Sequence, residues 1–343
     1  MHRKRSSQVG RPFGARAPTL QDVARVARVS TATISRALNN AQMVSPQTRS
    51  RVESAIAKTG YLPNRLAGGL ASKRSRLVAV LVPSIAASLF NETIEAMSLA
   101  LGSAGYLVML GITGYEPEGM NHAVTSLLSH RPDALILTSS PADQAIRRRL
   151  RTAGVTVIET WDLPRAPLDV AIGFSHRRAG QALAQFAIQS GYRRPLIVTH
   201  GLSRGRARME GFLENWSGRN LSPPVCDISP VAPFAIDGRK RLADFLDAGG
   251  RADVVLCSSD QVAYAVFAEA RARGLRVPED LAVIGFGASD SSMLAVPALT
   301  SVRIDGTEIG RRAAEILILR ARGGQPAVRR IDTGFEILKR DTA

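Results

Sequence analysis

The sequence predicts a small all-α domain followed by an α/β core of two lobes, each built on a doubly wound parallel sheet. Three observations support this fold class. Apolar residues recur at helical spacing within residues 19–59, positive charge is concentrated in the first 75 residues, and short apolar runs alternate with amphipathic segments from Leu77 onward. Such alternation is typical of parallel strands covered by helices. The 343 residues are enough for two or three folding units.

Residues 19–38 predict two short amphipathic helices separated by a tight break. The first is indicated by apolar residues at helical spacing, namely Leu20, Val23, Ala24 and Ala27. The break falls at 28–30, where Ser30 or Thr31 can accept a backbone N–H and cap the second helix. A third helix fits 46–59, because Ser45 can cap it, Pro46 is tolerated at the first helical position and Gly60 ends it. The pattern is that of a helix-turn-helix.

The outward face of the second helix carries small, hydrogen-bonding or cationic side chains: Thr31, Ala32, Thr33, Ser35 and Arg36. Such side chains suit the base edges and phosphates of a DNA major groove. Residues 1–75 hold fourteen Lys or Arg against two acids, a net of +12 out of +16 for the chain. We therefore expect double-stranded DNA as the partner; the alternative is a solvated basic face. The basic arm 1–17 either adds non-specific DNA contacts or is inert.

The core elements are expected as follows. Strands are predicted at 77–82, 106–112, 134–138, 155–160, 195–200, 253–258 and 281–286. Helices are predicted at 90–104, 118–130, 142–153, 177–190, 206–216, 237–248 and 261–273, while 222–233 is a proline-rich stretch with no predicted element. The two halves join near 173 and again near 301. Ligands of parallel sheets bind beyond the carboxyl ends of the strands, so we expect a cleft between the lobes.

Several classes of protein are disfavoured by the sequence. Cys226 and Cys257 follow no metal or redox spacing, and no apolar run approaches the roughly 20 residues of a membrane span. The start lacks the apolar stretch of a secretory signal, which argues against a periplasmic receptor. The glycines at 285 and 287 do not complete a dinucleotide fingerprint, and the five histidines show no ligand spacing. We expect no cofactor, no metal and no enzymatic activity, in a cytoplasmic protein.

From about Pro18 to its end the chain resembles the lactose-repressor (LacI) family of bacterial transcription regulators. The segments that carry the resemblance are TLQDVARVARVSTATISRALNN, VSPQTRSRVESAIAKTGYLPNRLA, LVAVLVPSIAASLF, RPDALIL, FSHRRAGQALA, RARMEGF, CSSDQVAYAV, LRVPEDLAVIGF and PALTSVRID. The gluconate-repressor branch looks more similar still, through LVPSIAASLFNE, GITGYEPE, VIETWDLP, LDVAIGFSH and DTGF. The resemblance implies a DNA-binding headpiece, a hinge helix and a dimeric core like a periplasmic sugar-binding protein.

The resemblance also implies domain boundaries. These are a disordered arm over 1–17, a helix-turn-helix domain over 18–62, a hinge over 63–75 and an effector-binding, dimerising core over 76–343. Within the core, lobe 1 would take about 76–172 and 301–330, and lobe 2 about 173–300 and 331–343. Some relatives form tetramers through a C-terminal leucine heptad, and this chain ends at FEILKRDTA without one, so we expect a homodimer.

Carried over from the family, Thr31 and Ala32 stand where bases are most often selected, and Arg36 also lies at the groove. Ala32 can contact only a thymine methyl, which weakens direct readout there. The full set expected at DNA is Thr19, Leu20, Ser30, Thr31, Ala32, Thr33, Ser35, Arg36, Asn39, Thr48, Tyr61, Asn64, Ala67 and Leu70. Arg28 stands where the family usually has glycine, and a left-handed backbone there would cost an arginine on the order of 1 kcal/mol.

The hinge prediction rests on residues 64–70. The family places a leucine at the position of Leu70 as a wedge in the minor groove. Gly68 and Gly69 each disfavour a helix by roughly 1 kcal/mol, so we expect the hinge to fold only when two copies meet on DNA. The alternative is a plain flexible linker. Loss of operator bending in Leu70→Ala would favour the wedge.

Family positions that line the effector cleft map to Ser84, Ser88, Phe90, Trp161, Asp162, Phe174, Arg208, Asp260, Gln261 and Gly287. A guanidinium such as Arg208 pairs bidentately with a carboxylate. Much of the family has a sugar-binding aspartate at the position of Gly287, so its absence favours an acidic effector, gluconate or a related sugar acid. Trp161 either covers one face of the effector or is a packing residue. A neutral sugar, another metabolite or an activator role stays open.

The resemblance also suggests a mechanism. An effector that prefers one cleft geometry would shift the lobes and alter the spacing of two headpieces on half-sites roughly one helical turn apart. The coupling is reciprocal and typically about 1–3 kcal/mol, so DNA would weaken effector binding by the same factor. Release from the operator is the common behaviour in the family.

Overall fold

The computed structural model describes residues 16–62, 74–86, 88–217, 221–229 and 235–343. The chain divides into two compact units, residues 1–75 and 76–343, and each is described on its own. Among the described residues, no helix is both long and apolar enough to cross a membrane.

The first unit is a three-helix headpiece. It consists of α1 (Leu20–Ala27), α2 (Thr31–Asn39), a 3-10 turn η1 (Ala41–Met43) and α3 (Pro46–Thr59). Thr19, Ser30 and Ser45 each accept a backbone N–H as the N-cap of one helix, as their position before an apolar stripe predicts. The small core consists of Val23, Ala24, Ala27, Ile34, Val52 and Ala55.

The turn between α1 and α2 is left-handed at Arg28, with φ 53° and ψ 47°. A side chain with a Cβ pays on the order of 1 kcal/mol for this conformation, so the cost expected from the sequence is present. Arg51 of α3 donates from Nη2 to the carbonyls of Ala27 (2.6 Å) and Arg28 (3.2 Å). These bonds satisfy carbonyls at the end of α1 that have no partner within the helix.

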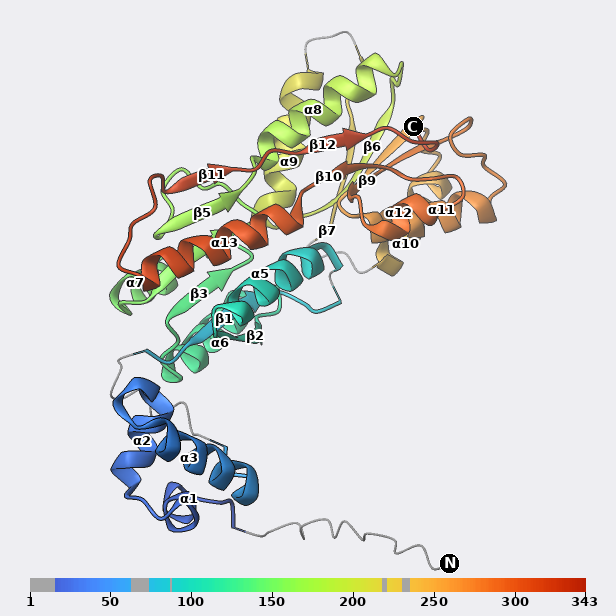
Figure 1. Cartoon of the computed structure of the whole chain (residues 1–343). Helices are drawn as coiled ribbons and strands as arrows, with labels where there is room; N and C mark the ends of the chain where they lie inside the picture. The colour runs from blue at the N-terminus through green and yellow to red at the C-terminus, as the bar shows by residue number, and fades with distance from the viewer. Residues whose placement is uncertain (1–15, 63–73, 87, 218–220, 230–234) are drawn as a thin grey trace, which may run out of the picture. The chain divides into compact units, whose positions relative to one another are not determined.

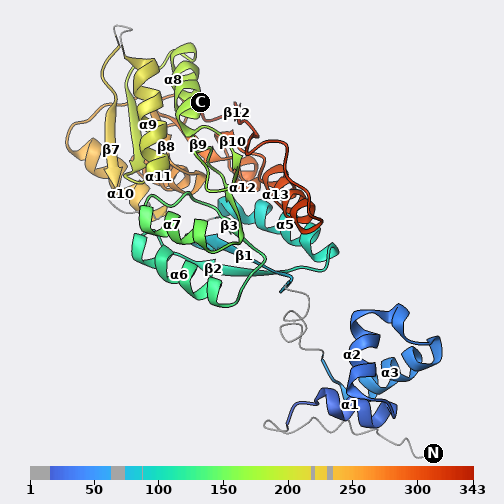
Figure 2. The ribbon, with the colours of Figure 1, turned by 90° about the vertical axis from the view of Figure 1, so that its left-hand side faces the viewer.

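The first sheet of the core is fully parallel and defines lobe 1. Its order is β11 (Arg330–Asp332), β5 (Val170–Gly173), β4 (Thr156–Thr160), β3 (Ala134–Leu137), β1 (Leu77–Val82) and β2 (Leu107–Ile112). One face is covered by α5 (Asn91–Ser103) and α13 (Gly306–Ala321), and the other by α6 (Pro117–Ser129) and α7 (Gln144–Thr152), as Figures 1 and 2 show. Val78 and Val80 pack on one side, and Ala79 and Leu81 on the other.

The second sheet defines lobe 2. Its order is β12 (Glu336–Leu338), β10 (Thr300–Arg303), β9 (Ala282–Gly287), β8 (Val254–Cys257), β6 (Pro195–His200) and β7 (Val225–Ser229). All neighbours are parallel except β12, which runs antiparallel to β10. The flanking helices are α8 (His176–Gln189), α9 (Ser203–Trp216), α10 (Ala235–Asp247) and α11 (Asp260–Ala272), while a 3-10 turn η2 (Ser88–Phe90) and α12 (Asp290–Leu294) lie in connections.

The chain crosses between the lobes at three places, two of them later than the sequence predicted. The second crossing, expected near 301, comes just after β10, because β10 pairs with β9 of lobe 2 and α13 then packs on α5 of lobe 1. The lobe 1 segment also extends beyond residue 330, since β11 pairs with β5 through Asp332. Strand pairing decides these boundaries, and the pairing of β11 with β5 joins residues more than 150 positions apart.

The proline-rich stretch 222–233 was expected to contain no regular element, and this prediction was incomplete. It contains the edge strand β7, whose Val225 pairs with Leu196 of β6. An edge strand forms hydrogen bonds on one side only and can be short and flanked by prolines, which is why its pattern was weak.

Candidate ligand and nucleic-acid sites

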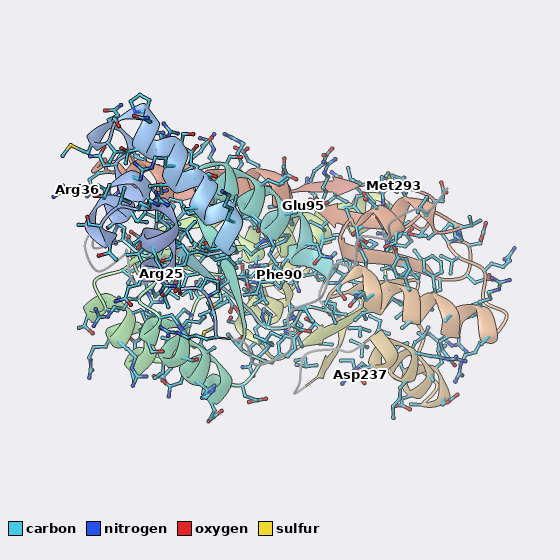
Figure 3. The ribbon with its side chains drawn as sticks, turned by 60° about the horizontal axis from the view of Figure 1, so that its bottom comes forward. Arg25, Arg36, Phe90, Glu95, Asp237 and Met293 are labelled. Carbon is cyan, nitrogen blue, oxygen red and sulfur yellow. The ribbon has the colours of Figure 1, made fainter. Side chains whose placement is uncertain are left out.

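The recognition face of the headpiece is formed by α2. Thr31, Ala32, Ser35 and Arg36 are exposed on this helix, and Figure 3 shows Arg36 extending away from it. Ser30 and Thr33 are joined at the start of the helix, where the Thr33 N–H donates to Ser30 Oγ at 3.1 Å. The backbone therefore places the predicted base-reading residues on one outward surface.

The other residues predicted to contact DNA differ in their hydrogen bonds and in their burial. Thr19 caps α1 and donates from Oγ1 to the Asp22 carboxylate at 2.7 Å. Thr48 accepts from Ser45 Oγ at 3.0 Å. Leu20 and Tyr61 are partly buried against the headpiece core. Asn39 lies at the last position of α2, and Asn64, Ala67, Leu70 and the glycines at 68 and 69 lie outside the described residues. The DNA contacts of all these residues stay predictions.

A cavity of about 650 Å³ lies between the two lobes of the core. Its walls are formed by residues that end or follow β1, β2, β3 and β4 of lobe 1 and β6, β8 and β9 of lobe 2. The carboxyl ends of parallel strands from both sheets therefore meet at one place, where open α/β sheets bind their ligands. The volume is in the range of small-molecule sites.

Six of the ten side chains predicted for the cleft line this cavity: Phe90, Trp161, Arg208, Asp260, Gln261 and Gly287. Three do not. Ser84 accepts from the N–H of Ala86 in its own turn, and Asp162 faces Arg204 with 4.0 Å between Oδ2 and Nε. Phe174 is fully buried, with its ring centroid 4.4 Å from that of His176. Ser88 opens η2, and its side chain is not described.

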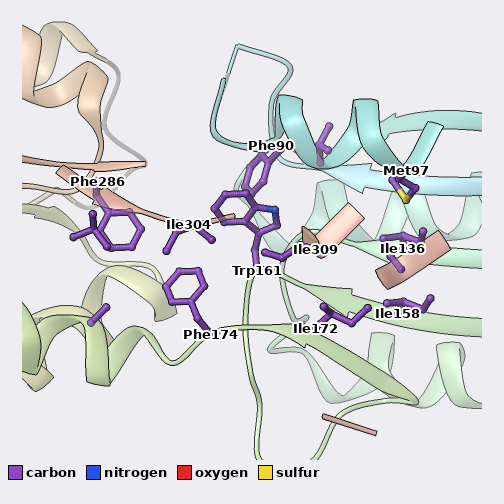
Figure 4. Packing of buried hydrophobic residues seen from close by; sticks show 14 of the residues in the cluster. Phe90, Met97, Ile136, Ile158, Trp161, Ile172, Phe174, Phe286, Ile304 and Ile309 are labelled. Atoms are coloured by element: carbon purple, nitrogen blue, oxygen red, sulfur yellow. The ribbon is translucent and has the colours of Figure 1, made fainter. Parts of the chain in front are cut away.

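The floor of the cavity is aromatic. Trp161 is 2% exposed and packs edge-to-face against Phe90, with 5.3 Å between ring centroids; Figure 4 shows it between Phe90 and Phe174. Its indole N–H donates to Thr93 Oγ1 at 2.9 Å, and its backbone is left-handed with φ 64°. Such strain persists only where the surroundings enforce it. Trp161 is thus a buried packing residue in the cavity wall.

Arg208, on α9 of lobe 2, also lines the cavity. It is 9% exposed, donates from Nη2 to the Ser258 carbonyl at 3.3 Å, and its guanidinium carbon lies 4.0 Å from the Phe286 ring centroid. Within the described part of the chain, no carboxylate forms an ion pair with it. Burial, with a further contribution from Arg204, lowers the pKa of Arg208 to about 9, so it is cationic at neutral pH. An unpaired buried cation is costly unless an anion joins it.

Two histidines complete this wall in the neutral form. Burial, followed by the charges of Arg208 and Arg204, lowers the pKa of His200 to about 4. The same causes hold the pKa of His176 well below its usual value. His176 Nε2 lies 2.9 Å from the Trp161 carbonyl, and a neutral ring must donate in that bond, which leaves Nδ1 as an acceptor.

Several buried polar atoms of the cavity wall have no hydrogen-bond partner in the described protein. They are Ser140 Oγ, His176 Nδ1, His200 Nδ1, Arg204 Nε and Ser258 Oγ. Buried polar groups are nearly always paired with protein or water, so these atoms are available to the polar groups of a ligand. Donors and acceptors occur together, which suits a molecule with several hydroxyl groups.

Asp260 and Gly287 shape the site. Ser301 Oγ donates to Asp260 Oδ1 at 2.5 Å, and the N–H of Ser289 donates to Oδ2 at 2.9 Å. This carboxylate therefore ties β10 to the segment that follows β9. Gly287 has φ 127°, a conformation open to glycine and strained for any other residue.

Arg204, His176 and His200 line the cavity but were not predicted from the sequence. The position of Arg204 could have been predicted from that of Arg208. Residues four apart on a helix share a face, and Arg204 lies one turn before Arg208. The described residues contain no cluster of His, Cys, Asp or Glu able to hold a metal ion.

Comparisons with known proteins agree with this architecture. Residues 19–64 match the model of bacterial regulatory proteins of the lacI family, and residues 184–343 match a periplasmic binding protein-like domain. The transcriptional regulator GntR of Pseudomonas aeruginosa is 34% identical over 327 residues, covering 95% of each protein.

Two solved structures are similar over nearly the whole chain. A LacI-family regulator from Silicibacter pomeroyi has a TM-score of 0.87 and 31% identity, covering 95% of this chain and 99% of that one. The lac repressor dimer bound to operator and an anti-inducer has a TM-score of 0.83 and 26% identity, with coverage of 95% and 99%. The chain belongs to the LacI family of DNA-binding bacterial transcriptional regulators, and among them it is related to the GntR-type regulators.

Proposed function

We propose that this regulator represses genes for sugar-acid catabolism in the cytoplasm, and that a sugar acid of the gluconate type, bound in the interlobe cavity, releases it from its operator. It acts by binding, without catalysis. The observation that carries the choice of effector is Arg208, a buried cation on the cavity wall with no carboxylate partner among the described residues.

The remaining wall suits the rest of such a molecule. A gluconate carboxylate would pair with Arg208, while its hydroxyls would meet the unpaired serine and histidine atoms. The cavity of about 650 Å³ has room for a six-carbon chain. At Gly287, where an aspartate would hold a neutral sugar, this chain has no side chain.

A calorimetric titration tests the effector class. The full-length protein is titrated with gluconate and with glucose, which has the same number of carbons but no carboxylate. We expect gluconate to bind and glucose to bind at least tenfold more weakly. Binding of glucose in preference to gluconate would overturn the sugar-acid proposal and favour the neutral-sugar alternative.

Operator binding tests the regulatory function. We expect the protein to prefer one palindromic duplex, such as a site beside its own gene, over random DNA, and gluconate to weaken that binding. Arg36→Ala should weaken specific binding by about tenfold to a hundredfold, the value of one good base contact. Arg49→Ala serves as the control, because Arg49 of α3 is exposed and paired with Glu53 at 2.9 Å. Tighter operator binding with gluconate would reverse the proposed sign.

Homodimerisation has its own support in lobe 1. The edge strand β2 exposes Leu107, Leu110 and Ile112, and Leu99 of α5 is 68% exposed. An exposed apolar edge strand invites pairing with another chain, and palindromic DNA requires two headpieces. We propose that a second copy covers this edge. Leu110→Asp should yield monomers in sedimentation, and an unchanged dimer would place the interface elsewhere.

A further inference from the structure

Arg204 joins the two lobes across the cavity. It lies in the first turn of α9 in lobe 2, and its Nη2 donates to the carbonyls of Thr138 and Thr160 in lobe 1, the latter at 3.1 Å. Asp162, also in lobe 1, faces it with 4.0 Å between Oδ2 and Nε. These acceptors lie at the carboxyl ends of β3 and β4, so one guanidinium holds the ends of two strands of the opposite lobe.

Among the described residues, two other polar contacts join the lobes near the cavity, one exposed and one where the chain itself crosses. Gln261 donates from Nε2 to the Ala86 carbonyl at 3.2 Å through an exposed bond. His176 contacts the Trp161 carbonyl, but it lies three residues after the end of β5. Arg204 has a side chain only 14% exposed, and charge-assisted hydrogen bonds are stronger when desolvated.

Arg204 also faces the place where an anion would bind. It lines the cavity, and its Nε is buried without a hydrogen-bond partner in the described protein. Arg204 and Arg208 lie one turn apart on α9 and both line the cavity, so their positive charges repel each other; this repulsion contributes to the lowered pKa of Arg208. An anion between the two guanidinium groups would relieve this repulsion and favour the geometry in which Arg204 reaches lobe 1.

We propose that Arg204, the carbonyls of Thr138 and Thr160, and Asp162 form an interlobe latch that transmits filling of the cavity to the position of the lobes. Arg208 binds the anion, and Arg204 is a positioning residue that converts binding into a shift between lobes. A ligand changes an equilibrium only through its differential affinity for the two states, and the latch supplies that difference. The link to gluconate rests on the function proposed above, whereas the latch itself does not.

The first test needs no effector. Hydrogen exchange is followed by mass spectrometry in the full-length protein, in peptides that cover 138–146 and 160–168. In Arg204→Gln we expect both segments to exchange at least fivefold faster, because their anchor in lobe 2 is lost. Arg206→Gln is the matched control, since Arg206 lies on the same helix but is exposed, and its hydrogen bond among the described residues goes to the Gly201 carbonyl of its own lobe. Wild-type exchange in both segments of Arg204→Gln would overturn the latch.

The second test separates binding from transmission. The ratio of operator dissociation constants with and without gluconate is measured alongside the gluconate dissociation constant. Allosteric ratios are typically about 5–150-fold; we expect about twofold or less in Arg204→Gln, while gluconate still binds through Arg208, with a weaker affinity because the Arg204 charge is lost. An undiminished ratio would overturn the latch as a transmitter. If gluconate does not bind the wild-type protein, the proposed effector fails and exchange alone decides the latch.

Two further variants separate a latch from a general packing role. Arg204→Lys keeps the charge but cannot span both carbonyls and Asp162 with one planar group, so we expect a partial response. Asp162→Asn leaves the two carbonyl bonds in place and should shift exchange in the same direction by a smaller amount. Should Arg204→Gln fail to fold, this pair decides the question, and wild-type exchange in both would overturn the latch.

Discussion

The two lobes of the core have the same topology but different chemistry at the cavity. Five strands of each follow an equivalent order, β2-β1-β3-β4-β5 in lobe 1 and β7-β6-β8-β9-β10 in lobe 2, and each sheet gains one strand from the end of the chain. The charged side chains that lobe 1 contributes to the wall are all acids, Glu92, Glu116 and Asp143, whereas lobe 2 contributes both arginines together with Asp260 and Asp290.

This difference shows that the position of the ligand site is set by the sheets, whereas its ligand specificity is set by the residues that follow the strands. Lobe 1 supplies the aromatic floor and the backbone carbonyls, and lobe 2 supplies the cations that would recognise an anion. The four predictions below test this division of roles.

The largest effect is expected from the floor of lobe 1. Trp161→Ala removes a buried indole that packs on Phe90 and bonds Thr93, and such truncations cost about 3–5 kcal/mol. We expect that loss in urea unfolding of the core followed by circular dichroism. Trp161→Phe, which keeps a ring but no N–H, should lose less. A loss below about 1 kcal/mol would show that the floor is not a packing element.

The buried histidines of lobe 2 should make the core sensitive to acid. The pKa of His200 is about 4 in the folded protein, below the ordinary value of about 6.5. The unfolded chain therefore takes up the proton first as pH falls, so stability is complete above pH 6.5 and declines toward pH 4, by up to about 3 kcal/mol.

Unfolding measured at several pH values checks this sign. His200→Gln should flatten the decline, whereas His130→Gln, at an exposed position of lobe 1, should leave it unchanged. A decline of equal size in His200→Gln and the wild type would contradict the assignment.

Recognition should depend on lobe 2 through Arg208. Arg208→Gln removes the charge that would pair with a carboxylate, and we expect gluconate to bind about a hundredfold more weakly, or about 2.7 kcal/mol. Titration calorimetry measures this, with Arg206→Gln as a control of the same type on the same helix. Unchanged affinity in Arg208→Gln would move recognition to another wall of the cavity.

The smallest effect is expected at the acidic rim of lobe 1. Partial desolvation and the Asp290 carboxylate raise the pKa of Glu92, so this carboxylate stands in an environment that already disfavours negative charge. Glu92→Gln should tighten gluconate binding by about twofold to fivefold, through reduced repulsion in a partly solvated site. Glu95→Gln, further along α5 and outside the cavity wall (Figure 3), should have no effect. Weaker binding in Glu92→Gln would show that Glu92 contacts the ligand.

Much of the fold could be predicted from local pattern. The three headpiece helices and their caps follow from helical spacing and from Thr19, Ser30 and Ser45, because these signals lie within a few residues of each other. The strands with continuous apolar runs, such as β1 and β6, were found for the same reason. The late strands β10, β11 and β12 are three or four residues long and were not predicted. Nothing in their own sequence indicates the strands with which they pair.

The candidate site divides in the same way. The sequence by itself determined a basic DNA-binding headpiece, two α/β lobes and a cleft with Arg208, because periodicity, charge and family motifs can be recognised from neighbouring residues in the chain. Only the tertiary structure decided that Phe174 lies beneath the floor, that His200 is neutral, and that Arg204 reaches the carbonyls of Thr138 and Thr160. Those features depend on desolvation and on contacts between strand ends 44 and 66 residues away from Arg204, and no local pattern encodes either.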